Sequence, residues 1–222
     1  MSVDDFGLIA PHLEAVTMPR SFVFIEANQR VEFIYFPDSG VASIISKSPE
    51  GLEAEAGLFG RDGFAPTSTI MGADTAPNKI LMQIGGAGWR LPNEVFLAAV
   101  EQSKTLRTLL TRYVQALMVQ ASYTALSNAV HPIDERLARW ILMCDDRSDG
   151  MALPLTHEFM SIMLAVRRPS VTTALHVLEG NGFIRSERGV LVILNRSGME
   201  EFAGDCYGPA EAEYRKLLGP MN

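Results

Sequence analysis

Arginine and hydroxyl side chains are concentrated between Thr156 and Arg196. This segment holds 5 arginines against 3 glutamates, a local charge of +2, whereas the whole chain of 222 residues holds 19 basic and 26 acidic side chains and has a net charge of −7. Arginine forms paired hydrogen bonds with phosphate and with the edge of guanine, and hydroxyl groups also bind phosphate. The segment therefore predicts recognition of a nucleic acid, and the acidity of the rest of the chain predicts modest nonspecific affinity.

The local pattern predicts how these side chains are positioned. Thr156 stands where a helix would begin, and Pro169 stands in the first turn of a second helix, after a break at residues 165–168. If the apolar residues of the second helix face a core, its polar residues face outward. The candidate DNA contacts of the two helices are Thr156, His157, Arg167, Arg168, Pro169, Ser170, Thr172, Thr173 and His176.

Arg168, at the start of the second helix, is the expected base reader, because a guanidinium paired with guanine is worth about 1–3 kcal/mol of discrimination. Residues 183–187 and 190–195 flank Arg188-Gly189 and predict a β-hairpin, in which Arg185 and Arg188 would lie beside the DNA backbone. Helix, turn, helix and hairpin in this order predict a winged helix-turn-helix, whose second helix enters the major groove.

Short β segments separated by turns precede this region. The expected strands, rich in β-branched and aromatic residues, are residues 21–25, 31–36, 40–46, 53–60 and 79–85. Short strands at a spacing of about ten residues predict a barrel or a double-sheet jelly roll. No glycine-rich phosphate loop interrupts them, and residues 21–92 hold no histidine, so neither a nucleotide-cleaving nor a metal-dependent jelly-roll enzyme is expected.

Residues 93–128 contain neither proline nor glycine and predict one long helix. Its apolar stripe could lie on the β segments or pair with the same helix of a second subunit. We expect the second arrangement, a homodimer, because the helix is longer than a small β domain can cover. The stripe consists of Leu106, Leu110, Tyr113, Leu117 and Ala121.

The sequence thus predicts an α+β protein of three parts. Residues 1–92 would form a double-stranded β-helix or jelly roll, residues 93–130 a long dimerisation helix, and residues 131–222 a winged helix-turn-helix domain. His131-Pro132 marks the boundary before the last part. Of the two cysteines, Cys144 is expected in the core and Cys206 at an exposed position near the C-terminus.

Two parts of the chain resemble the Crp/Fnr family of bacterial transcription regulators. ERLARWILMCDD (residues 135–146) and residues 153–203 are similar to the family's C-terminal domain, including its pattern through LTHEFM and RRPSVTT into the wing. VEFIYFPDSGVASII (residues 31–45) resembles a cyclic-nucleotide-binding-like β-roll, and FAGDCYG (residues 202–208) resembles the tail of one subgroup. The resemblance implies the β-roll, long helix and winged domain of that family, in the same order.

The resemblance also implies roles for single residues. The family's recognition-helix arginine falls on Arg168, and its phosphate-contacting threonine falls on Thr156. Pro169 and Thr173 stand where several relatives have a second base-contacting residue and a further arginine. We therefore expect this protein to read a different DNA half-site.

The known effectors of the family are not indicated. Relatives that bind cyclic AMP carry Gly-Glu-Leu and Arg-Ser or Arg-Thr, and residues 60–84 contain neither, so cyclic AMP is not expected in the familiar mode. The first 143 residues hold no cysteine, which excludes the N-terminal iron–sulfur cluster of oxygen-sensing relatives. His12 or His131 could ligate haem, but no motif supports it. No cofactor is therefore predicted.

These observations predict a homodimeric DNA-binding transcription regulator without enzymatic activity, acting on a pseudo-palindromic site and controlled by an effector at the β-roll. The expected partners are double-stranded DNA, a second copy of the chain and RNA polymerase. The alternative is a ligand-sensing regulator whose winged domain binds protein. A cytoplasmic protein is expected, because no apolar run approaches the ~18 residues of a membrane span and the N-terminus has acids where a secretory signal has lysines.

Overall fold

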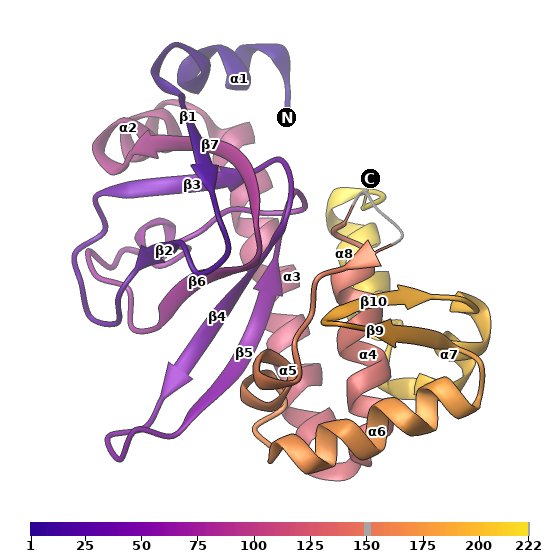
Figure 1. Cartoon of the computed structure of the whole chain (residues 1–222). Helices are drawn as coiled ribbons and strands as arrows, with labels where there is room; N and C mark the ends of the chain where they lie inside the picture. Colours follow the sequence, from indigo (N-terminus) through magenta and orange to yellow (C-terminus); the bar gives the residue numbers. More distant parts are fainter. Residues whose placement is uncertain (149–151, 222) are drawn as a thin grey trace.

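Two antiparallel sheets, a long helix and a predominantly helical domain follow one another along the chain in the computed structural model (Figure 1). The structure describes residues 1–148 and 152–221. The sequence DDRSDGM predicts a turn at residues 145–151, which therefore lies partly outside the described residues. The chain begins with α1 (Val3–Ile9), which packs against α2 (Asn93–Gln102), and with the 3-10 helix η1 (Ala10–His12).

The strands of residues 1–92, called the β-roll below, enclose one core. One sheet has the order β1-β7-β3 and the other the order β2-β6-β4-β5. Ile34, Phe59 and Met82 from the two sheets are fully buried in the same apolar cluster. The elements are β1 (Glu14–Met18), β2 (Val23–Ile25), β3 (Phe33–Pro37), β4 (Val41–Lys47), β5 (Glu53–Phe59), η2 (Thr69–Met71), β6 (Lys79–Ile84) and β7 (Gly86–Pro92).

The two-sheet roll and the α+β class are confirmed, but the sequence pattern does not single out β1 or β7. β7 contains Gly86 and Gly88, and glycine has low β-propensity. Glycine is nevertheless required, because a Cβ on Gly88 would lie 2.3 Å from the carbonyl oxygen of Phe36 on β3. The two strands approach too closely there for any side chain.

The helix predicted for residues 93–128 is interrupted at Ser103. This residue is extended, with φ −115° and ψ 117°, and α3 (Lys104–Val130) begins directly after it. Its Oγ accepts the backbone N–H of Leu106 and donates to Oδ1 of Asp5 at 2.5 Å. A capping serine can thus end one helix and start another without proline or glycine, so the absence of those two residue types does not guarantee a continuous helix.

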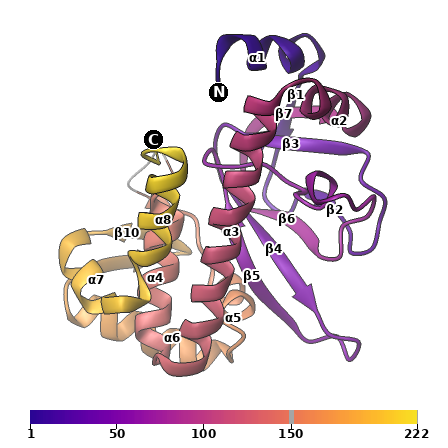
Figure 2. The same cartoon turned by 180° about the vertical axis from the view of Figure 1, so that it is seen from behind.

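α3 lies between the β-roll and the C-terminal helix α8 (Pro209–Leu218), as Figure 2 shows from behind. Leu106 and Leu110 of α3 are buried in the β-roll core. On the other side, α8 packs against α3, and its Tyr214 donates a hydrogen bond of 2.7 Å to the carbonyl oxygen of Asp62 in the β-roll. Neither α3 nor any other helix in the described part of the chain is both long and apolar enough to cross a membrane.

The C-terminal half is a helical domain with a small sheet of order β8-β10-β9. α4 (Ile133–Asp145) begins directly after Pro132, the predicted boundary residue, and buries Trp140 and Cys144. The other elements are β8 (Ala152–Leu153), α5 (His157–Met163), α6 (Arg168–Gly180), β9 (Ile184–Glu187), β10 (Val190–Ile193), α7 (Arg196–Ala203) and η3 (Gly204–Cys206). Helix, turn, helix and hairpin therefore occur in the predicted order.

The two halves share an apolar core and buried polar contacts. Val41 and Leu58 of the β-roll belong to the same buried cluster as Ile141 of α4. Arg147, just beyond α4, forms an ion pair of 2.7 Å with Asp62 of the β-roll, and both side chains are buried. The halves therefore pack as one body around α3 and α4.

Candidate nucleic-acid interface

Thr156 opens the first helix of the predicted DNA-binding pair. Its Oγ1 accepts the backbone N–H of Phe159 at 3.4 Å, so it is the N-cap of α5, as predicted. Oγ1 also accepts a hydrogen bond of 3.1 Å from Arg20 of the β-roll, whose Cζ lies 4.4 Å from the centre of the Phe159 ring. Nothing in the sequence signals Arg20, because it stands in a turn of the other half of the chain.

The connection from α5 to α6 is a tight turn. Ala165 adopts φ 51°, and α6 begins at Arg168 with Pro169 in its first turn. Proline fits there because the first N–H groups of a helix have no partner within it. Val171 and Leu175 are buried, so the opposite face of α6 is turned outward, as predicted from the pattern.

Two polar contacts join α5 and α6 on their outer side. Nη2 of Arg168 lies 2.8 Å from Oε1 of Glu158, and both side chains are more than half exposed. Nδ1 of His157 and Oγ1 of Thr172 are 3.1 Å apart. Because an exposed ion pair is worth at most about 1 kcal/mol, Arg168 can exchange Glu158 for another acceptor at little cost.

The wing turn lies beside the start of α5. Arg188 and Gly189 adopt φ 52° and 80°, the left-handed pair typical of two-residue hairpin turns. A Cβ on Gly189 would lie 3.7 Å from Cγ2 of Thr156. On the adjoining strand, Arg185 pairs with Glu187 at 3.5 Å. The tip of the wing and the N-cap of α5 are therefore neighbours.

The predicted DNA contacts come from three neighbouring elements: the start of α5, the turn into α6 with α6 itself, and the wing. Most of them are exposed, and three are half-buried. The exposed residues are His157, Arg167, Arg168, Pro169, Thr173, His176, Arg185 and Arg188, and the half-buried ones are Thr156, Ser170 and Thr172.

The apolar stripe of α3 predicted to form the dimer interface mostly faces the β-roll of its own chain. Leu106, Leu110 and Tyr113 are buried within the single chain, because the apolar β-roll core needs a cover. Leu117 and Ala121 are half-buried. The large apolar side chains of α3 that remain exposed are Met118, Leu126 and Val130.

Neither cysteine is exposed. Cys144 lies in the core as predicted, but the expectation for Cys206 is wrong, because η3 turns its Sγ inward to 2.9 Å from Oγ of Ser127 on α3. Burial raises the pKa of both thiols. His131 pairs with Asp205 at 2.9 Å, and the part of the chain that the structure describes holds no cluster of three or more histidine, cysteine or acidic residues suited to a metal.

Residues 135–202 match the family model described as a Crp-like helix-turn-helix domain. Similar solved structures include a Crp/Fnr-family transcriptional regulator from Eubacterium rectale, with 18% identity, a TM-score of 0.70, and coverage of 91% of this chain and 95% of that one. FixK2 from Bradyrhizobium japonicum has 13% identity and a TM-score of 0.73, covering 86% of this chain and 96% of its own.

The c-di-GMP-responsive global regulator CLP from Xanthomonas campestris has 15% identity and a TM-score of 0.69, covering 86% of this chain and 99% of its own. A comparison with curated protein sequences gave no match. At these identities the solved structures establish the fold, and the family model spans α4 through α7. The chain therefore has the fold of the Crp/Fnr transcription regulators and carries a Crp-like helix-turn-helix domain, as its resemblance to that family predicts.

Proposed function

We propose that this protein is a transcription regulator that binds DNA sequence-specifically as a homodimer on a pseudo-palindromic site. The convergence of Thr156, α6 and the turn at Gly189 on one largely exposed surface supports this function most directly. A winged helix-turn-helix uses these same parts, placing its second helix in the major groove and the other parts against the backbone. The Crp-like helix-turn-helix match supports the same reading.

Arg168 is the proposed base reader. It stands at the first position of α6, the end of a recognition helix that approaches the base edges. Its guanidinium would leave Glu158 and pair with O6 and N7 of a guanine. Pro169, the next residue, has no side-chain donor, so Arg168 would carry most of the direct reading at this end of the helix.

The remaining polar residues are proposed backbone or secondary contacts. Thr156 and His157 at the start of α5, with Arg185 and Arg188 on the wing, would bind phosphates on either side of the groove. Arg167 and Ser170 flank Arg168 at the beginning of α6, while Thr172, Thr173 and His176 follow along it. These contacts would fix the register in which Arg168 meets its base.

The exposed side of α3 is the proposed dimer interface, in place of the buried stripe. Met118 and Leu126 are 56% and 47% exposed, a high value for apolar side chains of this size. The exposed residues Ser122, Ala125 and Ala129 follow Met118 at intervals of three or four positions, and their small side chains allow two helices to approach. Pairing along this side would present two α6 helices roughly 34 Å apart, one turn of DNA.

A regulator of this kind would act in the cytoplasm and would communicate with RNA polymerase when bound to its site. The test is selection of bound duplexes from a random pool, followed by mobility-shift titration at low and moderate salt. We expect an enriched inverted repeat and an affinity that falls steeply with salt. If no sequence is enriched, specific DNA binding is wrong, and the protein-binding alternative for the winged domain becomes the better proposal.

A further inference from the structure

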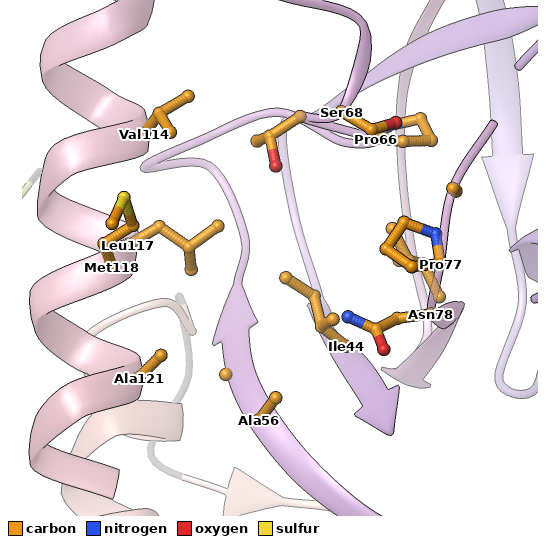
Figure 3. Close-up of a pocket in the computed structure, with 14 residues that line it drawn as sticks. Ile44, Ala56, Pro66, Ser68, Pro77, Asn78, Val114, Leu117, Met118 and Ala121 are labelled. Atoms are coloured by element: carbon orange, nitrogen blue, oxygen red, sulfur yellow. The ribbon is translucent and has the colours of Figure 1, made fainter. Parts of the chain in front are cut away.

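A cavity of about 270 Å³ lies between the β-roll and α3. Figure 3 shows side chains of α3 facing those of the β-roll across this space. One wall is formed by Val114, Leu117, Met118 and Ala121 of α3. The other walls come from β4, β5, β6 and the segments 66–68 and 76–78.

The lining of this cavity is almost entirely apolar. From the β-roll it includes Ile44, Ala56, Pro66, Pro77 and Ile80, and none of its lining residues is charged. The space is open to solvent at Met118, which is 56% exposed, so it is a pocket that a molecule can enter from outside. Its volume exceeds the roughly 150 Å³ that accommodates benzene in an enclosed apolar cavity, so it suits an aromatic or aliphatic molecule of greater size. A molecule with a net charge would lose its hydration there without gaining a counter-charge.

One polar group in the lining lacks a partner. Oγ of Ser68 is buried and makes no hydrogen bond in the structure, and a buried hydroxyl without a partner is unfavourable. Asn78 also lines the cavity, and its Oδ1 accepts a hydrogen bond of 3.3 Å from Ser46. A ligand with one hydrogen-bonding group could pair with Ser68 while the rest of its surface contacts carbon.

We propose that this cavity binds a small uncharged molecule with an apolar body and a single hydrogen-bonding group, and that Ser68 is the partner of that group. This class differs from a cyclic nucleotide, whose phosphate would need a cation that the lining does not supply. The site is defined by the β-roll and α3 within one chain, so ligand binding itself does not depend on the proposed DNA binding. Its regulatory consequence does rest on that proposed function.

The wall formed by α3 connects the cavity to the rest of the molecule. Gln120 lies between Leu117 and Ala121 in the sequence of α3 but does not line the cavity; it accepts the N–H of Leu58 on β5 at 2.8 Å and donates to its carbonyl oxygen at 3.1 Å. Met118 lines the cavity and also belongs to the exposed side of α3 proposed for dimerisation. A ligand that displaced this part of α3 would therefore alter both its bond to β5 and the dimer interface.

The test uses the full chain and N-phenyl-1-naphthylamine, an uncharged aromatic amine whose fluorescence rises in apolar surroundings. We expect saturable binding of one probe per chain, competition by 1-octanol, and no competition by cyclic AMP. Ala121→Phe, which fills the cavity, should reduce probe affinity at least tenfold. Ala98→Phe, at an exposed position of α2 away from the lining, is the matched control and should bind as the wild type does.

Ser68→Ala should weaken probe binding by about two- to tenfold, the range expected for the loss of one hydrogen bond. Ala56→Leu fills the opposite wall and replaces Ala121→Phe if the latter lowers the unfolding temperature. Absence of saturable binding, unchanged binding in both filled variants, or displacement by cyclic AMP would overturn the proposal. If the probe bound more strongly after dilution had separated a dimer, the proposal would also be overturned, because a second copy of the chain would then be what fills the cavity. A mobility shift on the same samples reports DNA binding separately.

Discussion

The indole Nε1 of Trp140 on α4 donates a hydrogen bond of 2.9 Å to the carboxylate of Glu55 on β5. Ser43 donates to the other oxygen of this carboxylate, as does Gln83 at 3.1 Å. Gln83 also contacts Sδ of Met163 at the end of α5. A buried acid of the β-roll is thus bonded directly to the domain that carries the candidate DNA interface.

Stability should fall with rising pH because of Glu55. Burial raises the pKa of this carboxyl from 4.5 to about 7, although hydrogen bonds from Ser43 and Trp140 oppose the shift. Between these two values the unfolded chain releases the proton while the folded chain holds it, so the free energy of unfolding should decrease by about 3 kcal/mol from pH 4.5 to 7 and level off above.

Urea unfolding of the wild type and Glu55→Gln across this pH range measures the effect. The difference between the two proteins should carry the pH dependence, with the wild type losing stability relative to the variant as pH rises. Parallel curves for the two proteins would show that Glu55 is not the responsible group.

Replacing Arg168 and Arg188 should have different effects on DNA binding. Arg168→Ala should relax preference at one base position in each half-site, by about 1–3 kcal/mol, because a base-edge contact is lost. Arg188→Ala should weaken binding to all DNA sequences alike, because a phosphate contact is lost. It should also reduce the slope of log affinity against log salt concentration by about one. Site selection and salt titration of both variants distinguish these effects, and identical preferences in the wild type and Arg168→Ala would contradict the assignment of Arg168.

Removing Glu158 should strengthen DNA binding. Glu158 pairs with Arg168 at 2.8 Å and places a negative charge where phosphates are expected. Glu158→Gln should therefore raise affinity by up to about fivefold, the equivalent of one exposed ion pair. Glu213→Gln, which breaks the Lys216 pair on α8, is a matched control without an expected effect. An unchanged affinity in Glu158→Gln would mean that Arg168 does not exchange partners on binding DNA.

A charge on the exposed side of α3 should separate the proposed dimer. Ala125→Glu places two like charges in the interface, and we expect light scattering to report the mass of one chain where the wild type gives two. Ala98→Glu, on the exposed side of α2, should leave the mass of the wild type unchanged. A dimer that survives Ala125→Glu would locate the interface elsewhere.

The cap between α2 and α3 should contribute measurably to stability. Ser103→Ala removes the acceptor for the N–H of Leu106 and one partner of Asp5, so the free energy of unfolding should drop by about 1 kcal/mol. Thr108→Ala removes an exposed hydroxyl on the same helix and should change the free energy of unfolding by less than about 0.5 kcal/mol. Equal effects in the two variants would show that the cap is not important.

Local signals were sufficient to predict the winged domain. The N-cap at Thr156, Pro169 in the first turn of α6 and the Arg188-Gly189 hairpin each act within a few residues, so the sequence determines them almost independently of the rest of the fold. The same holds for the β4 and β5 strands.

Contacts between distant residues were not predictable in this way. Arg20 meets Thr156, and Glu55 meets Trp140, only because the two halves pack together. An apolar stripe such as Leu106 and Leu110 has the same spacing whether it faces its own β-roll or a second chain. The choice between the two depends on the shape of the β-roll, which a single-helix pattern does not contain.

The position of α8 has a mechanical consequence. The winged domain continues from the end of α3 through α4, and after α7 the chain comes back to the flank of α3 as α8, where Tyr214 is bonded to Asp62 (Figure 2). The C-terminal half is therefore held to the same β-roll residue from two directions, by Arg147 after α4 and by Tyr214 of α8, in addition to the apolar core that the halves share. We therefore expect a displacement of the β-roll segment at Asp62 to move α4 and α8 together, and with them the winged domain that carries α6.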